Sequence, residues 1–547
     1  MSSDSHALEH TRNMRARSAA TSAAEKIVPS PTGVVHYRSR GRVLVIGGEE
    51  AQWLAARLEQ PLHAEILLIH GDDEPGVPTT ALGGRAMALS GYLGAFEARL
   101  GNEGHPNHQV LQADLVIDLS DTPLIDSELP PPGYWHFGTG PADLDAAVVA
   151  LDGMTGQFEK PRFFDYDADI CAHGRAGQPG CSRCIDSCPA DAIVSIGERV
   201  EVNPNLCQGG GICASVCPTG AMRYALPSPG DTAERVRTLL ITYLEAGGSD
   251  PIILFISDDD AGDLPPTPPN LLLVVVEELA SVGHEIWLAA LAWGARCVVL
   301  ANGGSVPQKS LTALNEQVAM LRGLLQGLSL PRYAINLTST SGALAECNTA
   351  GIACQPAVFG AAADKRQLAA LAIEHLREQT EGAPTVAPLP TGAPYGRILV
   401  DTHKCTLCMS CTSVCPAGAL AAGDDTPRLS LFETKCVQCG ICANACPEKA
   451  ITLEARYLFD PEQRRTARVL HEDPPFCCVS CGKPFAPRHA IDTILQKLVD
   501  HPMFQTERAR RRLQMCEDCR IVDAVQDDEA MQSPQFGASP RPPHHNG

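Results

Sequence analysis

Two regions of the chain combine short, wholly apolar runs with amphipathic stretches, a pattern that predicts alternating strands and helices. In residues 41–155 the predicted strands are 42–46, 65–69 and 114–118, with a helix from 49 to 58. In residues 231–378 they are 251–256, 271–276 and 297–300, with helices at 283–293 and 310–328. Runs that are apolar at every position are typical of parallel strands covered by helices on both faces. We therefore expect two Rossmann-like or flavodoxin-like α/β domains.

The first α/β region has a glycine pair directly after its first strand, where a nucleotide-binding loop would lie. The dinucleotide fingerprint G-x-G-x-x-G needs later glycines so that the backbone can approach a pyrophosphate. Glu49 and Gln52 stand at those positions, and Glu49 and Glu50 would place carboxylates beside an anion. We therefore prefer a plain or vestigial scaffold to an NAD or FAD site. A later Gly-bearing apolar stretch, residues 90–97, is interpreted as ordinary helix packing.

Residues 405–447 carry the run C-x2-C-x2-C-x3-C-P twice in tandem. This is the pattern of bacterial ferredoxins with two 4Fe–4S clusters, in which three cysteines of a run bind one cluster and the fourth binds the other. One predicted ligand set is therefore Cys405, Cys408, Cys411 and Cys446, and the other is Cys415, Cys436, Cys439 and Cys442. Zinc binding and chance are weaker interpretations, because four evenly spaced cysteines followed by proline occur twice.

Residues 160–228 contain another module of this type, which is the first of the two along the chain. Its first half departs from the pattern. Gln178 stands where the first cysteine of the run belongs. Cys171 comes earlier, across a loop rich in glycine and polar residues that can bring its thiolate to the same iron. We prefer Cys171 to His173 as the replacement ligand. The expected ligand set is then Cys171, Cys181, Cys184 and Cys217.

The second half of this module has Gly210 where a cysteine belongs, and glycine offers no ligand. The remaining expected ligands are Cys188, Cys207 and Cys213. Three outcomes are open: a 3Fe–4S cluster, a 4Fe–4S cluster with solvent or a borrowed side chain on one iron, or no cluster. We favour 3Fe–4S, because the retained C-x3-C-P unit argues against complete loss. The four C-P units also continue with similar residues, which indicates an internal repeat used four times.

Two C-x2-C pairs near the C-terminus predict a tetrahedral metal site with four sulfur ligands. The expected ligands are Cys478, Cys481, Cys516 and Cys519. Zinc in a structural role is favoured, and a mononuclear iron site is the alternative. Cys477 is one ligand too many and is interpreted as a spectator. The basic run at residues 508–512 is interpreted as a docking or solvated face.

The expected fold class is an α/β multidomain chain in which two Rossmann-like or flavodoxin-like domains alternate with two ferredoxin-like βαβ-repeat modules, followed by a four-cysteine knuckle. The α/β domains are residues 41–155 and 231–378, and the ferredoxin modules are residues 160–228 and 397–458. A Pro-rich linker is expected at 379–396 and the knuckle domain at 470–525. Disordered tails are expected at 1–40 and 526–547.

Charge and cysteine usage narrow the class of protein further. The net charge of −21 over 547 residues argues against nucleic-acid binding, because phosphates would repel the chain. Most of the 23 cysteines fall in metal-binding spacings, and thiolates must stay reduced to bind iron, so a cytoplasmic location is expected. No run approaches the length of a membrane span, and the N-terminus lacks the apolar stretch of a secretory signal.

The cysteine motifs resemble those of bacterial 8Fe ferredoxins, apart from Gln178 and Gly210. Residues 275–283 (V-V-E-E-L-A-S-V-G) and 287–295 (W-L-A-A-L-A-W-G-A) resemble the delta subunit of methyl-viologen-reducing hydrogenase. That family passes electrons between hydrogenase and heterodisulfide reductase, but its cluster cysteines have no counterparts here. The domain order is similar to that of large proteobacterial ferredoxin-like proteins found with formate dehydrogenase systems. The resemblance implies that the partner is a subunit of an oxidoreductase, and formate dehydrogenase is one such candidate.

These observations predict a multi-cluster protein that relays single electrons between a donor and an acceptor oxidoreductase. No hydrolytic or nucleophilic motif stands out, so no catalytic residue is assigned. The alternative is an iron–sulfur reductase with its own flavin or nicotinamide site, for which the sequence supplies no binding motif. A third interpretation makes the clusters structural or sensory.

Overall fold

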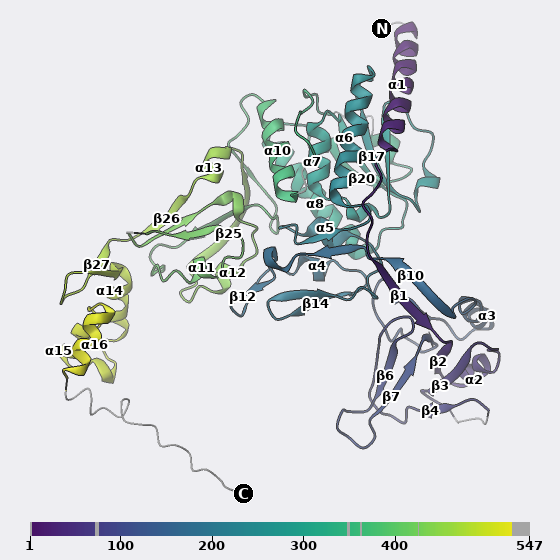
Figure 1. Ribbon diagram of the computed structural model, residues 1–547, viewed down its shortest axis with the longest axis horizontal. Helices are drawn as coiled ribbons and strands as arrows, with labels where there is room; N and C mark the ends of the chain where they lie inside the picture. The colour runs from purple at the N-terminus through teal and green to yellow at the C-terminus, as the bar shows by residue number, and fades with distance from the viewer. Residues whose placement is uncertain (1–2, 72–75, 347–350, 362–363, 425, 528–547) are drawn as a thin grey trace. The chain divides into compact units, whose positions relative to one another are not determined.

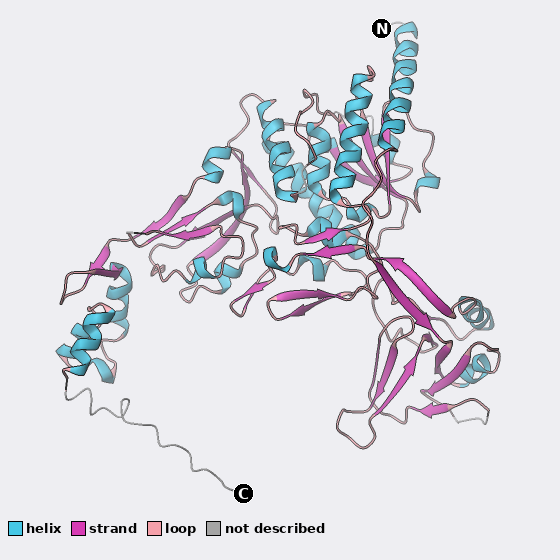
Figure 2. Ribbon diagram, viewed as in Figure 1, coloured by secondary structure: helices cyan, strands magenta, loops and turns pink. Residues whose placement is uncertain are grey.

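The computed structural model describes residues 3–71, 76–346, 351–361, 364–424 and 426–527. The chain divides into two compact units, Met1–Gly174 with Cys181–Pro390 and Arg175–Gly180 with Thr391–Gly547. Several separate sheets and many helices are present (Figure 2), so the prediction of a mixed α/β chain is confirmed. Of the tail expected at 526–547, residues 528–547 lie outside the described residues.

The first α/β region is a five-stranded parallel sheet with strand order β4-β3-β2-β8-β9. Its strands are β2 (Arg42–Gly47), β3 (His63–Leu68), β4 (Thr79–Ala81), β8 (Leu115–Asp118) and β9 (Tyr134–His136). Alternate residues of β2 enter two different cores, Val43 and Val45 on one face and Leu44 and Ile46 on the other. Helices α2 (Glu49–Ala55) and α3 (Pro141–Ala150) contribute to the first core.

The interpretation of residues 90–97 as helix packing is wrong. These residues end strand β5 (Met87–Ser90) and begin β6 (Phe96–Leu100), which form an antiparallel sheet with β7 (Gln109–Ala113). Gly94 has φ +85, and a Cβ there would lie 2.1 Å from the carbonyl oxygen of Arg38. Glycine is therefore needed for a tight turn between two strands.

The second α/β region is a four-stranded parallel sheet with strand order β18-β17-β19-β20. The strands are β17 (Ile252–Ser257), β18 (Leu271–Val276), β19 (Cys297–Asn302) and β20 (Ile335–Ser339). Helices α6 (Pro229–Glu245), α7 (His284–Ala292), α8 (Gln308–Gly327), the short α9 (Ala343–Glu346) and α10 (Lys365–Glu378) accompany it (Figure 1). Every residue of β17 is buried, as expected for a strand covered on both faces.

The N-terminal segment expected to be a disordered tail is ordered from residue 3. Helix α1 (Ser3–Ala24) packs against α6 and buries Ala16, Ala20 and Ala24, which lie four residues apart on one helix face. Strand β1 (Val34–Ser39) pairs antiparallel with β10 (Gly156–Pro161). The small alanine side chains let the two helices approach closely. Helix α6, which is distant in sequence, covers this face of α1, and the local sequence gives no sign of that contact.

The Pro-rich segment 379–396 also differs from the expected linker. It contains strand β21 (Val386–Pro388), and Ala383, Ala387 and Leu389 are at most 9% exposed. The guanidinium of Arg377 donates hydrogen bonds to the carbonyls of Thr380 and Ala383. Small apolar residues spaced along the segment let it pack against the domain rather than bridge solvent.

The two ferredoxin modules share one pattern of strands. In the first, β11 (Phe164–Tyr166) pairs with β16 (Met222–Tyr224), and β14 (Ile193–Ile196) pairs with β15 (Arg199–Val202). In the second, the equivalent pairs are β22 (Gly396–Val400) with β25 (Ile451–Leu458) and β23 (Leu420–Ala422) with β24 (Arg428–Leu431). The short helices are α4 (Arg183–Asp186), α5 (Ile212–Val216), α11 (Ser410–Ser413) and α12 (Ile441–Asn444). Each half of a module is thus a strand, a Cys-bearing loop with a short helix, and a strand.

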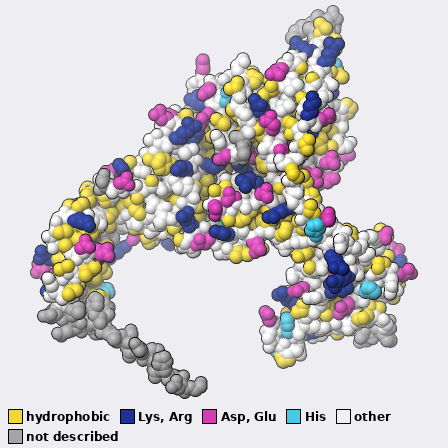
Figure 3. Space-filling model, in the orientation of Figure 1, with side chains coloured by type: hydrophobic (Ala, Val, Ile, Leu, Met, Phe, Trp, Pro, Cys, Tyr) yellow, Lys and Arg dark blue, Asp and Glu magenta, His cyan; other side chains and the backbone are white. Residues whose placement is uncertain are grey.

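The C-terminal region is a small domain with a β-hairpin and three helices. Its elements are β27 (Pro475–Cys477), β28 (Pro484–Pro487), α14 (Arg488–Lys497), α15 (Glu507–Arg512) and α16 (Glu517–Val525). In the basic run on α15, Arg508 and Arg512 form ion pairs with Asp523 and Asp527, whereas Arg510 and Arg511 are exposed. On the face shown in Figure 3, basic and acidic side chains are interspersed over much of the surface. No helix among the described residues has the length and apolar character that a membrane crossing requires.

A buried ion cluster supports the second module directly before one of its Cys loops. Glu433 is 5% exposed and accepts two hydrogen bonds from Arg456 on β25, at 2.8 and 2.7 Å. Arg468, on β26 (Arg468–Glu472), lies 2.9 Å from the same carboxylate. The carboxylate therefore fixes the turn Glu433–Lys435 that leads into the loop.

We expect Glu433→Gln to lower the free energy of unfolding of this module by about 3–5 kcal/mol, because it leaves a buried arginine without its counter-charge. Glu454→Gln is the matched control, since its pair with Arg397 is about one-third exposed and exposed pairs contribute only about 0–1 kcal/mol. Denaturant titration followed by visible absorbance measures both variants. Equal losses of stability in the two variants would contradict the prediction.

Candidate metal centres

Four cysteines of the second module line one cavity. They are Cys405, Cys408, Cys411 and Cys446. The loop that carries the first three bends through left-handed backbone at Leu407 (φ 54) and Met409 (φ 61), which turns successive thiols toward the same space. Cys408 is exposed, so this cavity lies at the surface of its unit.

The other four cysteines of the second module line a separate cavity. They are Cys415, Cys436, Cys439 and Cys442. The structure thus brings together both sets that the spacing predicted, and each run sends its fourth cysteine to the cavity of the other run. Three closely spaced cysteines reach one space, while the helical turn before proline points the fourth elsewhere.

Backbone N–H groups point at the sulfurs of the cysteines that precede the prolines. The amides of Ala419 and Ala450 lie 3.2 Å and 3.3 Å from the sulfurs of Cys415 and Cys446. The equivalent Cys217 receives the amide of Met222 at 3.4 Å. Hydrogen bonds of this kind stabilise a thiolate and help to set the potential of a bound cluster.

The first module brings the displaced Cys171 to its predicted partners. The loop between Cys171 and Cys181 is not a flexible tether but a β-hairpin of β12 (Gly174–Arg175) and β13 (Gln178–Pro179), closed by a 2.9 Å bond from the Cys181 amide to the carbonyl of Ala172. Burial, together with the nearby sulfurs of Cys217, Cys181 and Cys171, raises the pKa of Cys184 to about 12. These four sulfurs are therefore close enough to interact.

His173 is poorly placed to act as the competing ligand. Its Nδ1 lies 2.8 Å from the carbonyl of Cys181, and its Nε2 lies 2.7 Å from the hydroxyl of Ser195. Both ring nitrogens are thus engaged, one with the backbone at the end of the hairpin and the other with strand β14. Cys171, in contrast, is one of the sulfurs that raise the pKa of Cys184, so it is the side chain that we assign to the site.

The three remaining cysteines of the first module line a cavity together with the glycine loop 209–211. They are Cys188, Cys207 and Cys213. Gly209 (φ +88) and Gly211 (φ +71) require glycine, and a Cβ on Gly211 would lie 2.5 Å from the side chain of Ser281. Gly210 does not lie in the left-handed region, and a Cβ there would meet only Pro189, at 3.9 Å. The backbone therefore has room for the side chain that the sequence omits.

No other side chain that lines this cavity within the described structure replaces the missing cysteine. Apart from the cysteines, Gln208 alone among the lining residues has a polar side chain. Its amide nitrogen donates to the carbonyls of Leu129 and Pro130 at 3.1 and 2.7 Å, which ties the side chain to a neighbouring loop. The site therefore offers three thiols.

The protonation behaviour of the cysteines fits a bound cationic group. Burial first, and then neighbouring sulfurs, raise the pKa of Cys411 to about 12 and the pKa of Cys213 well above its usual value. Thiols in such sites do not ionise without a nearby positive charge, and iron supplies it. The converging sulfurs and the cavities between them therefore fit iron–sulfur clusters, with Gly210 leaving one corner without a protein ligand.

Sequence reasoning missed Lys160, which lies beside the three-cysteine site. Its ammonium is 2.6 Å from the carbonyl of Cys207 and 3.1 Å from that of Asn205. Burial lowers the pKa of Lys160 to about 8, against the opposing effect of the Cys207 sulfur. Nothing in the local pattern of strand β10 marks this lysine, because its partners lie about 45 residues away.

The C-terminal domain brings its four predicted sulfur ligands within 4.8 Å of one another. Cys478 and Cys481 flank the hairpin turn, whereas Cys516 and Cys519 lie at the start of α16. Burial opposes ionisation of Cys478, but backbone N–H groups of Cys481, Cys516 and Ser480 lower its pKa to about 6. A tetrahedral set of four sulfurs fits zinc or a single iron. The neighbouring Cys477 is exposed and outside the set.

The glycine pair of the first α/β region does not form an anion site. The carboxylate of Glu50 accepts the Gly48 amide at 2.8 Å, so the chain's own negative charge occupies the start of α2. A Cβ on Gly48 would lie 2.4 Å from His70, which shows that the loop is closed rather than open to a phosphate. This geometry agrees with the preference for a scaffold without a dinucleotide.

Comparisons with known proteins identify iron–sulfur regions in both modules. Residues 404–451 match a family described as a 4Fe-4S dicluster domain, and residues 200–223 match one described as a 4Fe-4S binding domain. An uncharacterized ferredoxin of Methanocaldococcus jannaschii is 39% identical over 44 residues, which are 71% of that protein and 8% of this chain. The predicted 4Fe–4S, ferredoxin-type character of the chain is thereby confirmed.

Proposed function

Because the chain belongs to the ferredoxin family of iron–sulfur proteins, we propose that it relays single electrons between a donor and an acceptor oxidoreductase. The observation that carries this proposal is the convergence of cysteine sets on separate cavities in two modules of one chain. A cubane cluster, when bound, takes up or releases one electron with little change in its ligands. Several such sites in one polypeptide provide successive redox sites between which an electron can pass.

Three of the four proposed ligand sets line the cavities described above, and the fourth is the set of Cys171, Cys181, Cys184 and Cys217. Three sites have four cysteines each and are assigned 4Fe–4S clusters, and the site of Cys188, Cys207 and Cys213 is assigned a 3Fe–4S cluster. The cysteines would hold the irons, and the N–H groups directed at sulfur would stabilise the thiolates. The C-terminal set of four cysteines is assigned a structural zinc ion.

Partner and location follow from the surface and the resemblance. The exposed Cys408 places one site within reach of a docked protein, which suits electron entry or exit there. The similarity in domain order to proteins of formate dehydrogenase systems supports an oxidoreductase of that kind as partner. A net charge of −21 disfavours nucleic acid, and the need for reduced thiolates favours the cytoplasm.

The proposal is tested on full-length protein purified without oxygen. We expect a brown protein with about fifteen irons in its clusters. Dithionite should bleach the visible absorbance, and an oxidant should restore it. NADH alone should leave the absorbance unchanged, since the carboxylate of Glu50 occupies the glycine loop of the first parallel-sheet domain. A colourless, iron-free protein would refute the proposal, and bleaching by NADH without a partner would favour the reductase alternative.

A further inference from the structure

Two lysines, one on strand β10 and one on helix α8, donate hydrogen bonds to the carbonyls of predicted ligands at the three-cysteine site. Lys160, from β10, reaches the carbonyl of Cys207 at 2.6 Å. Lys309, from α8, reaches the carbonyl of Cys188 at 3.5 Å. Each ammonium also favours negative charge on the sulfur of the same cysteine. Two of the three ligands of this site therefore have a cation beside them.

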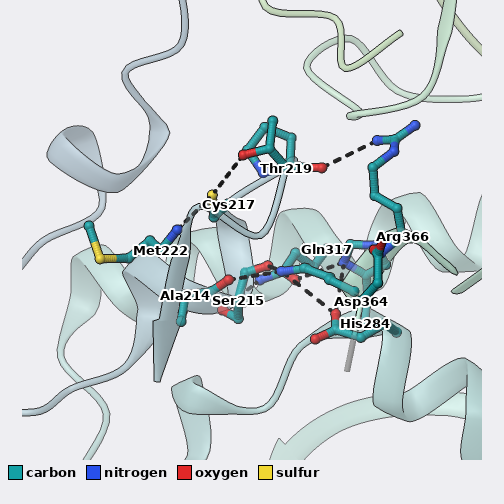
Figure 4. A network of polar contacts seen from close by, with 12 residues as sticks. Ala214, Ser215, Cys217, Thr219, Met222, His284, Gln317, Asp364 and Arg366 are labelled. Carbon is teal, nitrogen blue, oxygen red and sulfur yellow. Dashed lines mark hydrogen bonds and ion pairs between the residues drawn. The ribbon is translucent and has the colours of Figure 1, made fainter. Parts of the chain in front are cut away.

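A third lysine holds the helix that begins at the remaining ligand of the site. Lys365, from α10, donates to the carbonyls of Ala214 and Ser215 at 2.8 and 2.6 Å. Figure 4 shows the surrounding contacts, in which Gln317 donates to the Ser215 hydroxyl at 3.2 Å. The second α/β region thus covers the segment that connects Cys213 with the next cluster site.

This cover distinguishes the first module from the second. Ser215 and Pro218 are buried, whereas Asn444 and Pro447, at the same positions of the repeat in the second module, are exposed. A site shielded from water has a lower local dielectric, so a nearby charge acts on it more strongly.

The charges of the three lysines are not equally compensated. Lys309 is 41% exposed and paired with Asp191 at 2.8 Å, and Lys365 lies 3.6 Å from the buried carboxylate of Glu285. No carboxylate in the described part of the chain forms an ion pair with Lys160. Its ammonium instead lies 5.0 Å from the ring centre of Tyr37. Lys160 is therefore the lysine that brings a net positive charge to this site.

We propose that Lys160 makes the three-cysteine site the most readily reduced of the four cluster sites. An electron that enters the chain then occupies this site in preference to the other three. One electron from a donor iron–sulfur protein adds one negative charge at the site, and no bond to the chain forms or breaks. The adjacent ammonium lowers the energy of that added charge, which raises the reduction potential. This inference rests on the proposed electron-transfer function and assigns the first module the role of holding the electron.

The test is an anaerobic potentiometric titration of full-length protein, monitored by electron paramagnetic resonance. The signal of the three-cysteine site is identified by its change in the Gly210→Cys variant. In the unmodified protein we expect this signal to respond at a higher potential than those of the other three sites. Lys160→Met should shift its midpoint to a lower potential, and Lys160→Arg, which keeps the charge, should restore it. The midpoints of the other sites should stay in place.

Lys309→Met is the matched control, because it removes a lysine from the same site whose charge Asp191 already balances. We expect a smaller shift than for Lys160→Met. The inference is overturned if the three-cysteine site is reduced at or below the potential of the others, or if Lys160→Met shifts its midpoint no more than Lys309→Met does. Clusters that accept no electron at any applied potential would instead refute the proposed function, and this inference with it.

Discussion

Replacing Gly210 with cysteine is expected to add one iron atom to each chain and to abolish the signal of the oxidised 3Fe–4S cluster. Gly210 occupies the position of Cys439 in the repeat, and its backbone is not left-handed. The new Cβ would meet only Pro189, at 3.9 Å, so the thiol can take the empty corner of the site without displacing the loop. Iron analysis and electron paramagnetic resonance of anaerobic protein measure the change.

Two further variants make this result specific to the thiol. Gly210→Ala adds the same Cβ without sulfur, and it should keep the original iron content and signal. Cys439→Gly makes the reverse change in the second module, and it should create a second 3Fe–4S signal with the loss of one iron. If Gly210→Cys folds and yet gains no iron, the assignment of a cluster to Cys188, Cys207 and Cys213 is wrong.

Replacing Cys516 with serine is expected to release the metal of the C-terminal domain and to unfold that domain. Among the described residues, the hydrophobic cluster around this site has three buried members, Cys478, Met515 and Cys516, two of which are predicted metal ligands. Binding of a structural zinc contributes about 10–16 kcal/mol in zinc-finger peptides, far more than so small a cluster supplies. Metal analysis should show the loss of one zinc, and limited proteolysis should cleave within residues 475–525.

Cys477→Ser is the control for this experiment, because Cys477 is exposed and adjacent to a ligand but outside the sulfur set. It should retain the metal and resist the protease as the unmodified protein does. The absorbance of the clusters should stay unchanged in both variants, since their cysteines lie in other modules. Retention of zinc by the Cys516→Ser variant would contradict the assignment, and one iron atom in place of zinc would favour the mononuclear alternative.

The parallel sheets were the part of the fold that local sequence predicted best. Strands β2, β17, β18 and β19 lie within a residue or two of the expected apolar runs. A strand buried on both faces must be apolar at every position, so its sequence shows the pattern directly. Strands β5 to β7 were missed because each strand exposes part of its length. Their sequences therefore lack the continuous apolar run of a strand that is buried on both faces.

The wrong expectations share one physical cause. Helix α1 and the segment around β21 are polar or Pro-rich by composition, and each is ordered by packing on distant residues. Likewise, the sequence of α15 gave no sign that two of its arginines, Arg508 and Arg512, pair with Asp523, which lies on α16. The composition of a segment indicates how that segment behaves in isolation, whereas these segments pack against residues that are distant in sequence.

By itself, the sequence determined the iron–sulfur chemistry of this protein, because a thiolate ligand must be a cysteine and the reach of a short loop fixes the spacing of the set. It also located the position that lacks a cysteine, since Gly210 breaks an otherwise regular repeat. Only the tertiary structure decided that Gly210 has room for a side chain and that Lys160 lies against Cys207. Those facts depend on which distant segments fold against the loop. Burial also strengthens the electrostatic effect of a nearby charge such as that of Lys160, and the local sequence does not show which charges will be buried there.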